Sequence, residues 1–265
     1  MLITLLTDFG TADYFVGAMK GVILSINAEA VVVDITHEVA PQDVLEGAFT
    51  LGAACVSFPP GTIHVAVVDP GVGSARRGIL VAGGGQYFVG PDNGLFSFVY
   101  ERDPSARVFH LTNEKYFGPR VSATFHGRDV FAPAAAALSN GVAPEEFGEE
   151  IEDFVRLPGL RPRRAGDGTI EAAVIHVDRF GNCVTNLTPA ELDEETLAAG
   201  ARLAINGRVI TSFRRFFSEE TDAPGELFAT WGSAGYLEIA AYRASAAGLL
   251  DAERGQIIKV LSTEC

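Results

Sequence analysis

The chain has few cysteines, and their placement narrows the kind of protein it can be. Three occur among 265 residues, Cys55, Cys183 and Cys265, and no two of them form a C-x-x-C pair. An odd number at such wide spacing predicts neither a disulfide framework nor a zinc site. This usage is typical of a protein that works in a reducing compartment, so we expect a cytoplasmic location.

Basic residues are also scarce. Lysine and arginine total 20 against 34 acidic residues, which gives a formal net charge of −14. Affinity for nucleic acid depends on neutralising phosphates with lysine and arginine, so nucleic acid is not an expected partner. A cationic small molecule is compatible with the charge, although solubility alone explains it more simply.

Long apolar runs are missing as well. No stretch of eighteen apolar residues occurs, and the apolar start at residues 1–8 is short and lacks the basic residues of a signal peptide. We therefore expect no membrane-spanning helix, no membrane partner and no export by that route. The mean hydropathy of +0.20 is ordinary for a globular chain, and the length suits two modest domains.

Apolar runs and helical periods alternate through the first part of the chain. Strands are predicted at residues 2–6, 31–35 and 63–68, helices at 14–26, 44–56 and 127–138, and a hairpin at 79–82 and 86–89. Strands that alternate with helices predict an α/β fold with a mainly parallel sheet. We assign this domain to residues 1–157.

The pattern changes after a segment rich in proline, glycine and arginine. We interpret residues 158–168 as a linker. Short strand patterns follow at residues 170–177, 203–205, 208–213, 227–230, 236–240 and 257–261, with a short helix at 244–250. These patterns predict a smaller, mostly β domain over residues 169–265.

Two aspartates follow predicted parallel strands, and ligands of such sheets lie at the carboxyl ends of the strands. Asp8 closes the first strand, where its carboxylate could accept both hydroxyls of a ribose. An equally simple interpretation is that Asp8 caps the following helix and that Asp13 is solvated.

Asp69 begins a turn in which Pro70 fixes the backbone and two glycines, Gly71 and Gly73, permit close approach to a ligand. Arg76 lies within reach across that loop. The alternative is a structural turn with a surface arginine, because the glycine spacing matches neither a phosphate-binding loop nor a dinucleotide fingerprint.

His126 precedes a predicted helix, whose dipole favours the neutral imidazole that can accept a proton. A structural histidine is the alternative. Arg128 and Asp129 follow at once, and we interpret them as an ion pair in the first turn that holds the His126 loop.

The mostly β domain offers a second polar group at residues 178–182. Phe180 could stack on a purine while Asn182 reads a base edge beside Asp178, although an ordinary Gly-Asn turn explains the segment equally well. Residues 231–238 are similar to a polar binding loop, but glycine-serine turns are common and need not bind a ligand.

The remaining histidines, His37, His64, His110 and His176, lack metal-ligand spacing. His64 and His176 lie within apolar strand runs, and we interpret those two as structural. The segment Pro-Asp-Asn-Gly at residues 91–94 is most simply a tight turn.

Six segments carry a resemblance in their order along the chain. They are TDFGTADYFVGAMKG at residues 7–21, VVDPGVGSARR at 67–77, GPDNGL at 90–95, TFHGRD at 124–129, DRFGN at 178–182 and GSAGYLEIA at 232–240. Together they resemble the S-adenosyl-L-methionine (SAM) hydroxide adenosyltransferase family, the hydrolytic relatives of the bacterial fluorinase and chlorinase.

The resemblance implies an α/β N-terminal domain, a barrel-like β C-terminal domain, and a homotrimer with active sites between the domains of neighbouring subunits. The implied substrate is SAM, without cofactor or metal. The implied catalytic residues are Asp69, Arg76 and His126. Asp8 matches the carboxylate that holds the ribose diol, Asp13 a contact to the methionine amino group, and Asp178, Phe180, Asn182, Ser233 and Glu238 match positions that line the methionine and adenine ends of the pocket.

The implied reaction is in-line attack of water or hydroxide at the ribose C5′, which releases adenosine and methionine. Three alternatives remain. One is a halogenase of the same family, which the resemblance disfavours because halogenating relatives have other residues at positions 69 and 126 and a serine where Gly127 stands. The others are a hydrolase with Asp8, Asp69 and His126 as metal ligands, and a non-catalytic sensor of adenosine or SAM.

Overall fold

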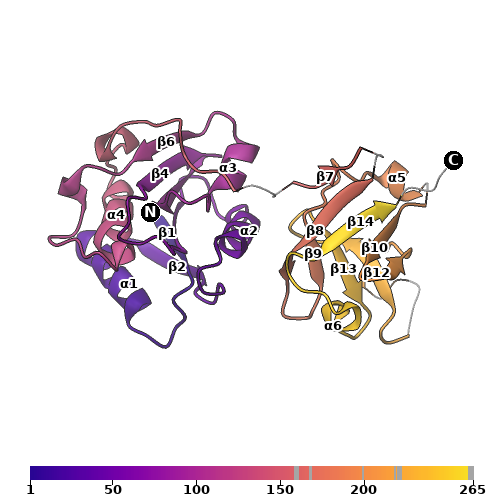
Figure 1. The fold of residues 1–265 in the computed structure, drawn as a ribbon. Helices are drawn as coiled ribbons and strands as arrows, with labels where there is room; N and C mark the ends of the chain where they lie inside the picture. Colours follow the sequence, from indigo (N-terminus) through magenta and orange to yellow (C-terminus); the bar gives the residue numbers. More distant parts are fainter. Residues whose placement is uncertain (158–160, 167–168, 199, 218, 220–222, 262–265) are drawn as a thin grey trace. The chain divides into compact units, whose positions relative to one another are not determined.

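The computed structural model describes residues 1–157, 161–166, 169–198, 200–217, 219 and 223–261. The chain divides into two compact units, Met1–Leu157 and Pro158–Cys265, drawn in Figure 1. Within the described ranges, no helix has the length and apolarity needed to cross a bilayer. Cys55 and Cys183 are both buried with free thiols, and Cys265 lies outside the described residues.

The N-terminal unit is built on one mixed sheet. Its strands are β1 (Leu2–Thr7), β2 (Val31–Thr36), β3 (Ile63–Val67), β4 (Gly78–Gly83), β5 (Gln86–Pro91) and β6 (Arg107–His110). They lie in the order β2-β1-β3-β5-β4-β6. β2, β1, β3 and β5 are parallel, and β4 runs antiparallel to β5 and β6. The mainly parallel sheet and its β4–β5 hairpin are therefore confirmed.

Helices cover both faces of this sheet. They are α1 (Phe15–Ile26), α2 (Val44–Cys55), α3 (Ser97–Arg102) and α4 (Ala132–Ser139), with shorter turns η1 (Glu114–Tyr116), η2 (Gly127–Phe131) and η3 (Pro144–Phe147). Leu5 and Val65 share a core with α1 and α4, whereas Leu6 and Ala66 share one with α2 and α3. Figure 1 shows α1 and α4 on one side of the sheet and α2 and α3 on the other. Burial on both faces explains why β1 and β3 are continuous apolar runs.

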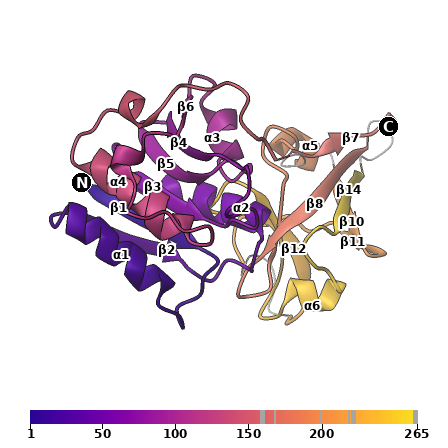
Figure 2. The ribbon, with the colours of Figure 1, turned by 60° about the vertical axis from the view of Figure 1, so that its left-hand side comes forward.

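The C-terminal unit is mostly β, as expected. Its strands are β7 (Arg163–Arg164), β8 (Ile170–Val177), β9 (Cys183–Thr185), β10 (Arg202–Ile205), β11 (Arg208–Ile210), β12 (Leu227–Trp231), β13 (Leu237–Ala241) and β14 (Ile257–Leu261), with short helices α5 (Glu194–Ala198) and α6 (Ala246–Leu250). The order is β11-β10-β14-β8-β9-β13-β12, and β7 pairs with β8. Figure 2 shows β8, β14 and β10 side by side.

The two ends of this second sheet meet. The backbone N–H of Arg214, just beyond β11, donates to the carbonyl of Ala229 on β12 at 2.8 Å, and the Ala229 N–H donates to the Ser212 carbonyl at 2.8 Å. These bonds nearly close the sheet and satisfy its edges. The expectation of a barrel-like β domain is confirmed.

Two local features differ from the expectations. The single helix predicted at residues 127–138 is split into the π-helical turn η2 and the α-helix α4. Pro133 lies at the start of α4 and has no backbone N–H to donate, so the regular hydrogen-bond ladder begins there. The segment interpreted as a linker contains β7, while residues 158–160 and 167–168 lie outside the described residues.

His64 on β3 is structural, as expected. Its side chain is fully buried and lies between the rings of Phe58 and Phe88, with centroid distances of 5.6 and 5.0 Å. Thr4 Oγ1 lies 2.7 Å from its Nδ1 atom. Burial lowers the pKa of His64 from 6.5 to about 4, because a charged imidazole would be desolvated there.

This pKa predicts an acid-dependent loss of stability. The folded chain binds a proton at His64 less readily than the unfolded chain, so the stabilisation is complete above pH 6.5 and declines as pH falls toward the folded pKa of about 4. Between pH 7 and 4.5 this group should remove about 2 to 3 kcal/mol from the free energy of unfolding. Urea titrations of wild type and His64→Gln measure it; an equal decline in both would contradict the assignment.

Candidate active site

The carboxyl ends of β1 and β3 bring the first candidate residues to one edge of the N-terminal sheet. The parallel register pairs Thr7 with Val67. Asp8 therefore follows the paired end by one residue and Asp69 by two. The expectation that both aspartates lie at this edge is confirmed, and ligands of parallel sheets bind at such edges.

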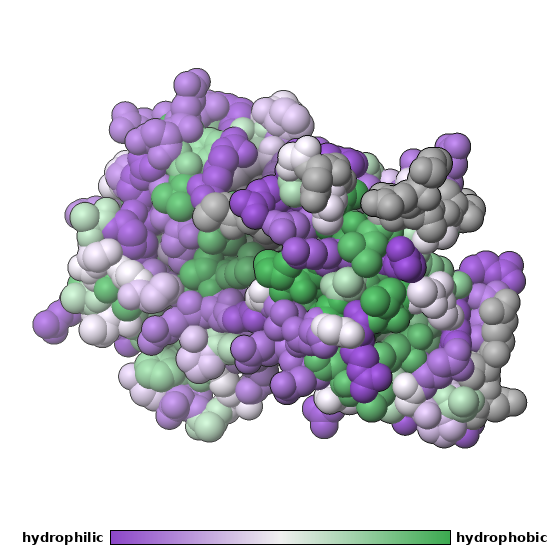
Figure 3. All heavy atoms as spheres, turned by 45° about the vertical axis from the view of Figure 1, so that its right-hand side comes forward, coloured by the Kyte–Doolittle hydropathy of each residue, from purple (hydrophilic) through white to green (hydrophobic). Residues whose placement is uncertain are grey.

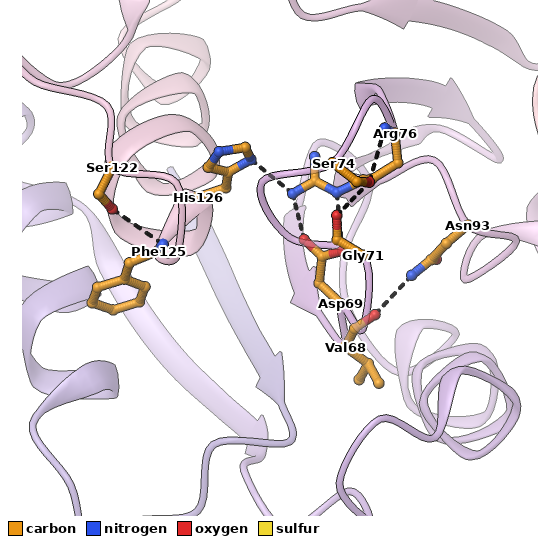
Figure 4. Close-up of polar contacts among 9 residues, drawn as sticks. All are labelled: Val68, Asp69, Gly71, Ser74, Arg76, Asn93, Ser122, Phe125 and His126. Atoms are coloured by element: carbon orange, nitrogen blue, oxygen red, sulfur yellow. Dashed lines mark hydrogen bonds and ion pairs between the residues drawn. The ribbon is translucent and has the colours of Figure 1, made fainter.

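Arg76 joins Asp69 to His126 (Figure 4). Its Nε atom donates to Asp69 Oδ1 at 2.9 Å and its Nη2 atom to Asp69 Oδ2. The same Nη2 atom lies 2.8 Å from His126 Nδ1. Only 4% of the Asp69 side chain and 11% of the Arg76 side chain are exposed, so the ion pair of this Asp69–Arg76–His126 cluster is shielded from solvent, while His126 is half-buried.

The guanidinium determines the protonation of His126. Because arginine can only donate hydrogen bonds, His126 Nδ1 must carry a lone pair and its proton resides on Nε2. Burial lowers the pKa of His126, and the nearby positive charge of Arg76 lowers it further. Both effects favour the neutral imidazole expected from the helix position, with burial and Arg76 as the causes. Nε2 is left as a hydrogen-bond donor.

The loop that carries Asp69 and Arg76 is fixed from within. Ser74 Oγ donates to the Gly71 carbonyl at 2.7 Å and accepts from the Arg76 N–H at 3.2 Å. Gly73 adopts a φ of +77°, and a Cβ atom there would lie 2.1 Å from the Ala123 carbonyl oxygen. The loop thus packs directly on the backbone that precedes His126, which only glycine permits.

The segment at residues 91–94 forms hydrogen bonds to both ends of the loop that carries Asp69 and Arg76. Asn93 Nδ2 donates to the carbonyl of Val68, next to Asp69, at 2.8 Å. Asp92 is buried and accepts from Nε and Nη2 of Arg77 at 3.0 and 2.8 Å. Interpreting this segment as a simple tight turn missed its role. The sequence did contain a signal for this role, because Asp92 and Asn93 are two polar residues at the end of β5, a strand parallel to β3.

The loop before His126 is held by Asp129. Its Oδ2 accepts from the Ser122 N–H at 2.9 Å, and Ser122 Oγ accepts from the Phe125 N–H at 3.1 Å. Arg128 Nε donates to Asp129 Oδ1 at 2.6 Å. Burial would raise the pKa of Asp129, but hydrogen bonds from Arg128 and Ser122 lower it below its usual value. The expected ion pair that holds the His126 loop is confirmed.

Asp8 does not cap the helix that follows it. The N-cap residue of α1 is Tyr14, which has no side-chain cap hydrogen bond. Asp8 Oδ2 instead accepts from the backbone N–H of Gln42 at 2.7 Å, and Gln42 has a φ of +67°. The capping alternative is therefore wrong, and the carboxylate faces the connection that follows β2. Asp13 is exposed.

The C-terminal unit brings Asp178, Asn182 and Glu238 together. Asp178 Oδ1 accepts from the N–H groups of Phe180 and Asn182 at 2.9 and 2.8 Å, and its Oδ2 accepts from Asn182 Nδ2 at 2.9 Å. Burial raises the pKa of Glu238, and the negative charge of Asp178 raises it further. Ser233 is exposed in the turn between β12 and β13.

A cavity of about 490 Å³ lies beside this group. It is lined by Phe180, Asn182, Phe217, Ala241, Arg243 and Ala244. The Phe180 side chain is prominent here, because 78% of it is exposed. Sequence reasoning identified Phe180 and Asn182 but missed Phe217 and Arg243, which no motif distinguishes from surface residues.

The metal-ligand alternative is not supported by this geometry. Both carboxylate oxygens of Asp69 accept from Arg76, a cation that would repel a metal ion. Among the residues that the structure describes, no group of three or more His, Cys, Asp or Glu side chains is arranged to hold a metal.

Two family models match the chain. The SAM hydroxide adenosyltransferase N-terminal domain matches residues 3–148, and the C-terminal domain of the same family matches residues 172–259. This chain belongs to the SAM hydroxide adenosyltransferase family. The Asp69–Arg76–His126 cluster falls within the first match, and Asp178, Asn182 and Glu238 fall within the second.

Relatives of this SAM hydroxide adenosyltransferase chain align over nearly its whole length. A protein of Methanocaldococcus jannaschii named (R)-S-adenosyl-L-methionine hydrolase is 36% identical over 98% of this chain and 95% of its own. One of Salinispora arenicola with the same name is 40% identical over 97% of both. A fluorinase of Nocardia brasiliensis is 26% identical over 98% of this chain and 96% of its own. A crystal structure of an uncharacterized conserved protein from Thermotoga maritima has a TM-score of 0.89 at 34% identity, covering 98% of this chain and 99% of that one.

Gly73 tests how the loop is built. Gly73→Ala should lower the free energy of unfolding by about 2 kcal/mol or more, because the new methyl group meets a backbone oxygen and the left-handed backbone is strained. Urea titration measures the loss. Gly71→Ala is the matched control, since its Cβ would make only ordinary contacts, from 3.4 Å, with Arg76 and Ser74. Equal stabilities of the two variants would contradict the close approach.

Proposed function

We propose that this chain hydrolyses SAM to adenosine and L-methionine by attack of water at the ribose C5′. The Asp69–Arg76–His126 cluster is the observation that carries the proposal, because it offers an imidazole N–H beside a cation and a carboxylate that are both shielded from solvent. Family membership supports it, as do the hydrolases that match at 36–40% identity over nearly full length.

The difficult part of this reaction is activation of the nucleophile. Methionine leaves as a neutral thioether, so the leaving group needs no general acid. Water, with a pKa of about 15.7 in bulk, must be activated by a base, a nearby cation or both. The buried charge of Arg76 stabilises developing hydroxide, and holding oxygen, carbon and sulfur in line supplies much of the remaining acceleration.

The hydrogen-bond pattern divides the roles within the cluster. His126 uses Nδ1 to accept from Arg76, so its Nε2–H donates to the attacking oxygen and orients it. Each Asp69 oxygen accepts one hydrogen bond from Arg76 and retains a further lone pair, which can accept the proton of the water. Proton acceptance therefore falls to Asp69 and positioning to His126, a sharper division than the sequence suggests.

We assign the remaining candidate residues to substrate binding. Asp8 holds the ribose diol with the acceptor sites that Gln42 leaves free, and Asp13 contacts the methionine amino group. Over-stabilising the cationic ground state would slow its neutralisation, so both position the substrate and do not set the rate.

The C-terminal residues suit the ends of the substrate. Asn182 gives one N–H to Asp178, which leaves its carbonyl and second N–H for an adenine edge. The exposed ring of Phe180 can stack on the base. Asp178, Ser233 and Glu238 complete the pocket, where the two carboxylates suit an ammonium group.

We further propose a cytoplasmic homotrimer with active sites between subunits and no nucleic-acid or membrane partner. The assigned residues are divided between the two units. Phe180, Phe216 and Phe217 are exposed large hydrophobic residues of the C-terminal unit, and within each unit Figure 3 shows apolar side chains at the surface next to hydrophilic ones. Such surfaces are typical of protein interfaces. The free thiols of Cys55 and Cys183 suit a reducing compartment.

Halogenation is disfavoured at Gly127. A Cβ atom there would lie 3.2 Å from Met19 Sδ and 3.4 Å from the Phe125 ring. The serine of halogenating relatives would therefore require the neighbours to move. The fluorinases are also more distant, at 26% identity.

The test is an incubation with SAM in halide-free buffer that contains a chelator and is made with ¹⁸O water. Mass analysis should find adenosine with heavy oxygen at C5′. Asp69→Ala should lower turnover by about 10²-fold or more, whereas Glu29→Ala, which removes an exposed carboxylate, should retain it.

Other products would overturn the proposal. Adenosine without the label would identify a nucleophile other than water, and turnover that stops in the chelator would restore the metal hypothesis. A halogenated nucleoside formed on adding chloride or fluoride would indicate a halogenase. Saturable binding without any product would indicate a sensor.

A further inference from the structure

A chain of polar contacts links α1, the end of β2 and the end of β1, where Thr7 precedes Asp8. Lys20 Nζ lies 2.6 Å from Asp34 Oδ2, and His37 Nε2 lies 3.1 Å from Asp34 Oδ1. Thr7 Oγ1 lies 2.9 Å from His37 Nδ1. The chain thus connects a surface ion pair to a threonine that immediately precedes Asp8.

The Asp34 carboxylate determines which groups donate and which accept hydrogen bonds along this chain of contacts. The Nε2 atom of His37 lies 3.1 Å from Asp34 Oδ1 without forming a regular hydrogen bond, but a carboxylate beside it still favours a proton on that nitrogen. In the neutral imidazole Nδ1 then accepts, so the Thr7 hydroxyl donates to it. The Thr7 oxygen is left to accept, and it accepts from the Phe9 N–H at 3.2 Å.

His37 also holds the same turn through its backbone. The Gly10 N–H donates to the His37 carbonyl at 2.7 Å. Asp8 lies between Thr7 and Phe9, so it is flanked by residues that His37 fixes, directly or through Thr7. Only 4% of His37 is exposed, so water does not readily replace these contacts when they are lost.

We propose that His37 is a positioning residue for the nucleoside site: through Thr7 and Gly10 it fixes the turn that aims Asp8. The inference rests on the proposed function in one respect, the assignment of Asp8 to the ribose diol. Because Asp8 binds and does not react, loss of His37 weakens nucleoside binding and raises KM while kcat is retained.

A second buried histidine of the same unit supplies a matched control. His64 Nδ1 lies 2.7 Å from Thr4 Oγ1, also on β1, and is fully buried. The pair therefore repeats the Thr7–His37 contact three residues earlier on the strand, away from Asp8. His64→Phe should cost stability without affecting nucleoside affinity, which separates positioning from a general effect on the core.

The experiment measures adenosine binding by calorimetry and SAM turnover in the full-length protein. His37→Phe and Thr7→Val should each weaken adenosine binding and raise KM by roughly 3- to 10-fold, with kcat within about twofold. The double variant should bind no more weakly than Thr7→Val alone, because both changes break one chain. His37→Asn, whose amide oxygen can replace Nδ1 as acceptor, should recover most of the affinity.

The rate of hydrogen–deuterium exchange at residues 7–10 measures how firmly this turn is held, without any ligand. The Phe9 amide should exchange faster in His37→Phe, recover in His37→Asn and stay as in wild type in His64→Phe. Unchanged exchange, unchanged adenosine affinity in His37→Phe, or additive losses in the double variant would each overturn the inference. If wild type forms no adenosine from SAM but the variants show the predicted changes in adenosine affinity, the proposed reaction fails and the positioning role of His37 stands. If wild type binds no adenosine, the exchange rate of the Phe9 amide alone tests the positioning role.

Discussion

The guanidinium of Arg76 is the group on which the rest of the N-terminal site depends. It donates to both oxygens of Asp69 and to Nδ1 of His126, so it determines the hydrogen-bonding state of both side chains at once. Removing it would leave a largely buried carboxylate without its counter-ion, which is costly. Gly73, which permits the loop's close approach, and Asn93, which holds the backbone next to Asp69, both keep this guanidinium in place.

The carboxylates separate into two kinds according to their partners. Asp69 is bound to a largely buried cation, at the point where we propose that the nucleophile is activated. Asp8 is bound by a backbone N–H, and Asp178 by backbone and amide N–H groups. Neutral donors fix the direction of these two carboxylates without cancelling their charge, as binding of hydroxyl and ammonium groups requires. In the proposed function, this division lets one acidic chain hold a cationic substrate and still activate water.

Sequence patterns were informative where structure is local. The apolar runs of β1 and β3 predicted a parallel sheet because both of its faces are buried, and that topology placed Asp8 and Asp69 at one edge. Contacts between distant segments left no pattern. Thr7 and His37 are thirty residues apart, the role of Asn93 depends on a neighbouring strand, and the donor that displaces Asp8 from a capping role is the Gln42 backbone. Pro133 was a local signal in the sequence that the helix after His126 is divided, because proline is typical of the first turn of a helix.

The most direct test of the account is a crystal structure of the protein with adenosine and L-methionine bound. The proposed mechanism requires that the ribose hydroxyls contact Asp8, that the 5′-hydroxyl lies within hydrogen-bonding distance of Arg76 and His126 Nε2, and that the methionine sulfur lies on the opposite side of C5′. A nucleoside bound with its 5′ carbon away from the Asp69–Arg76–His126 cluster would contradict it.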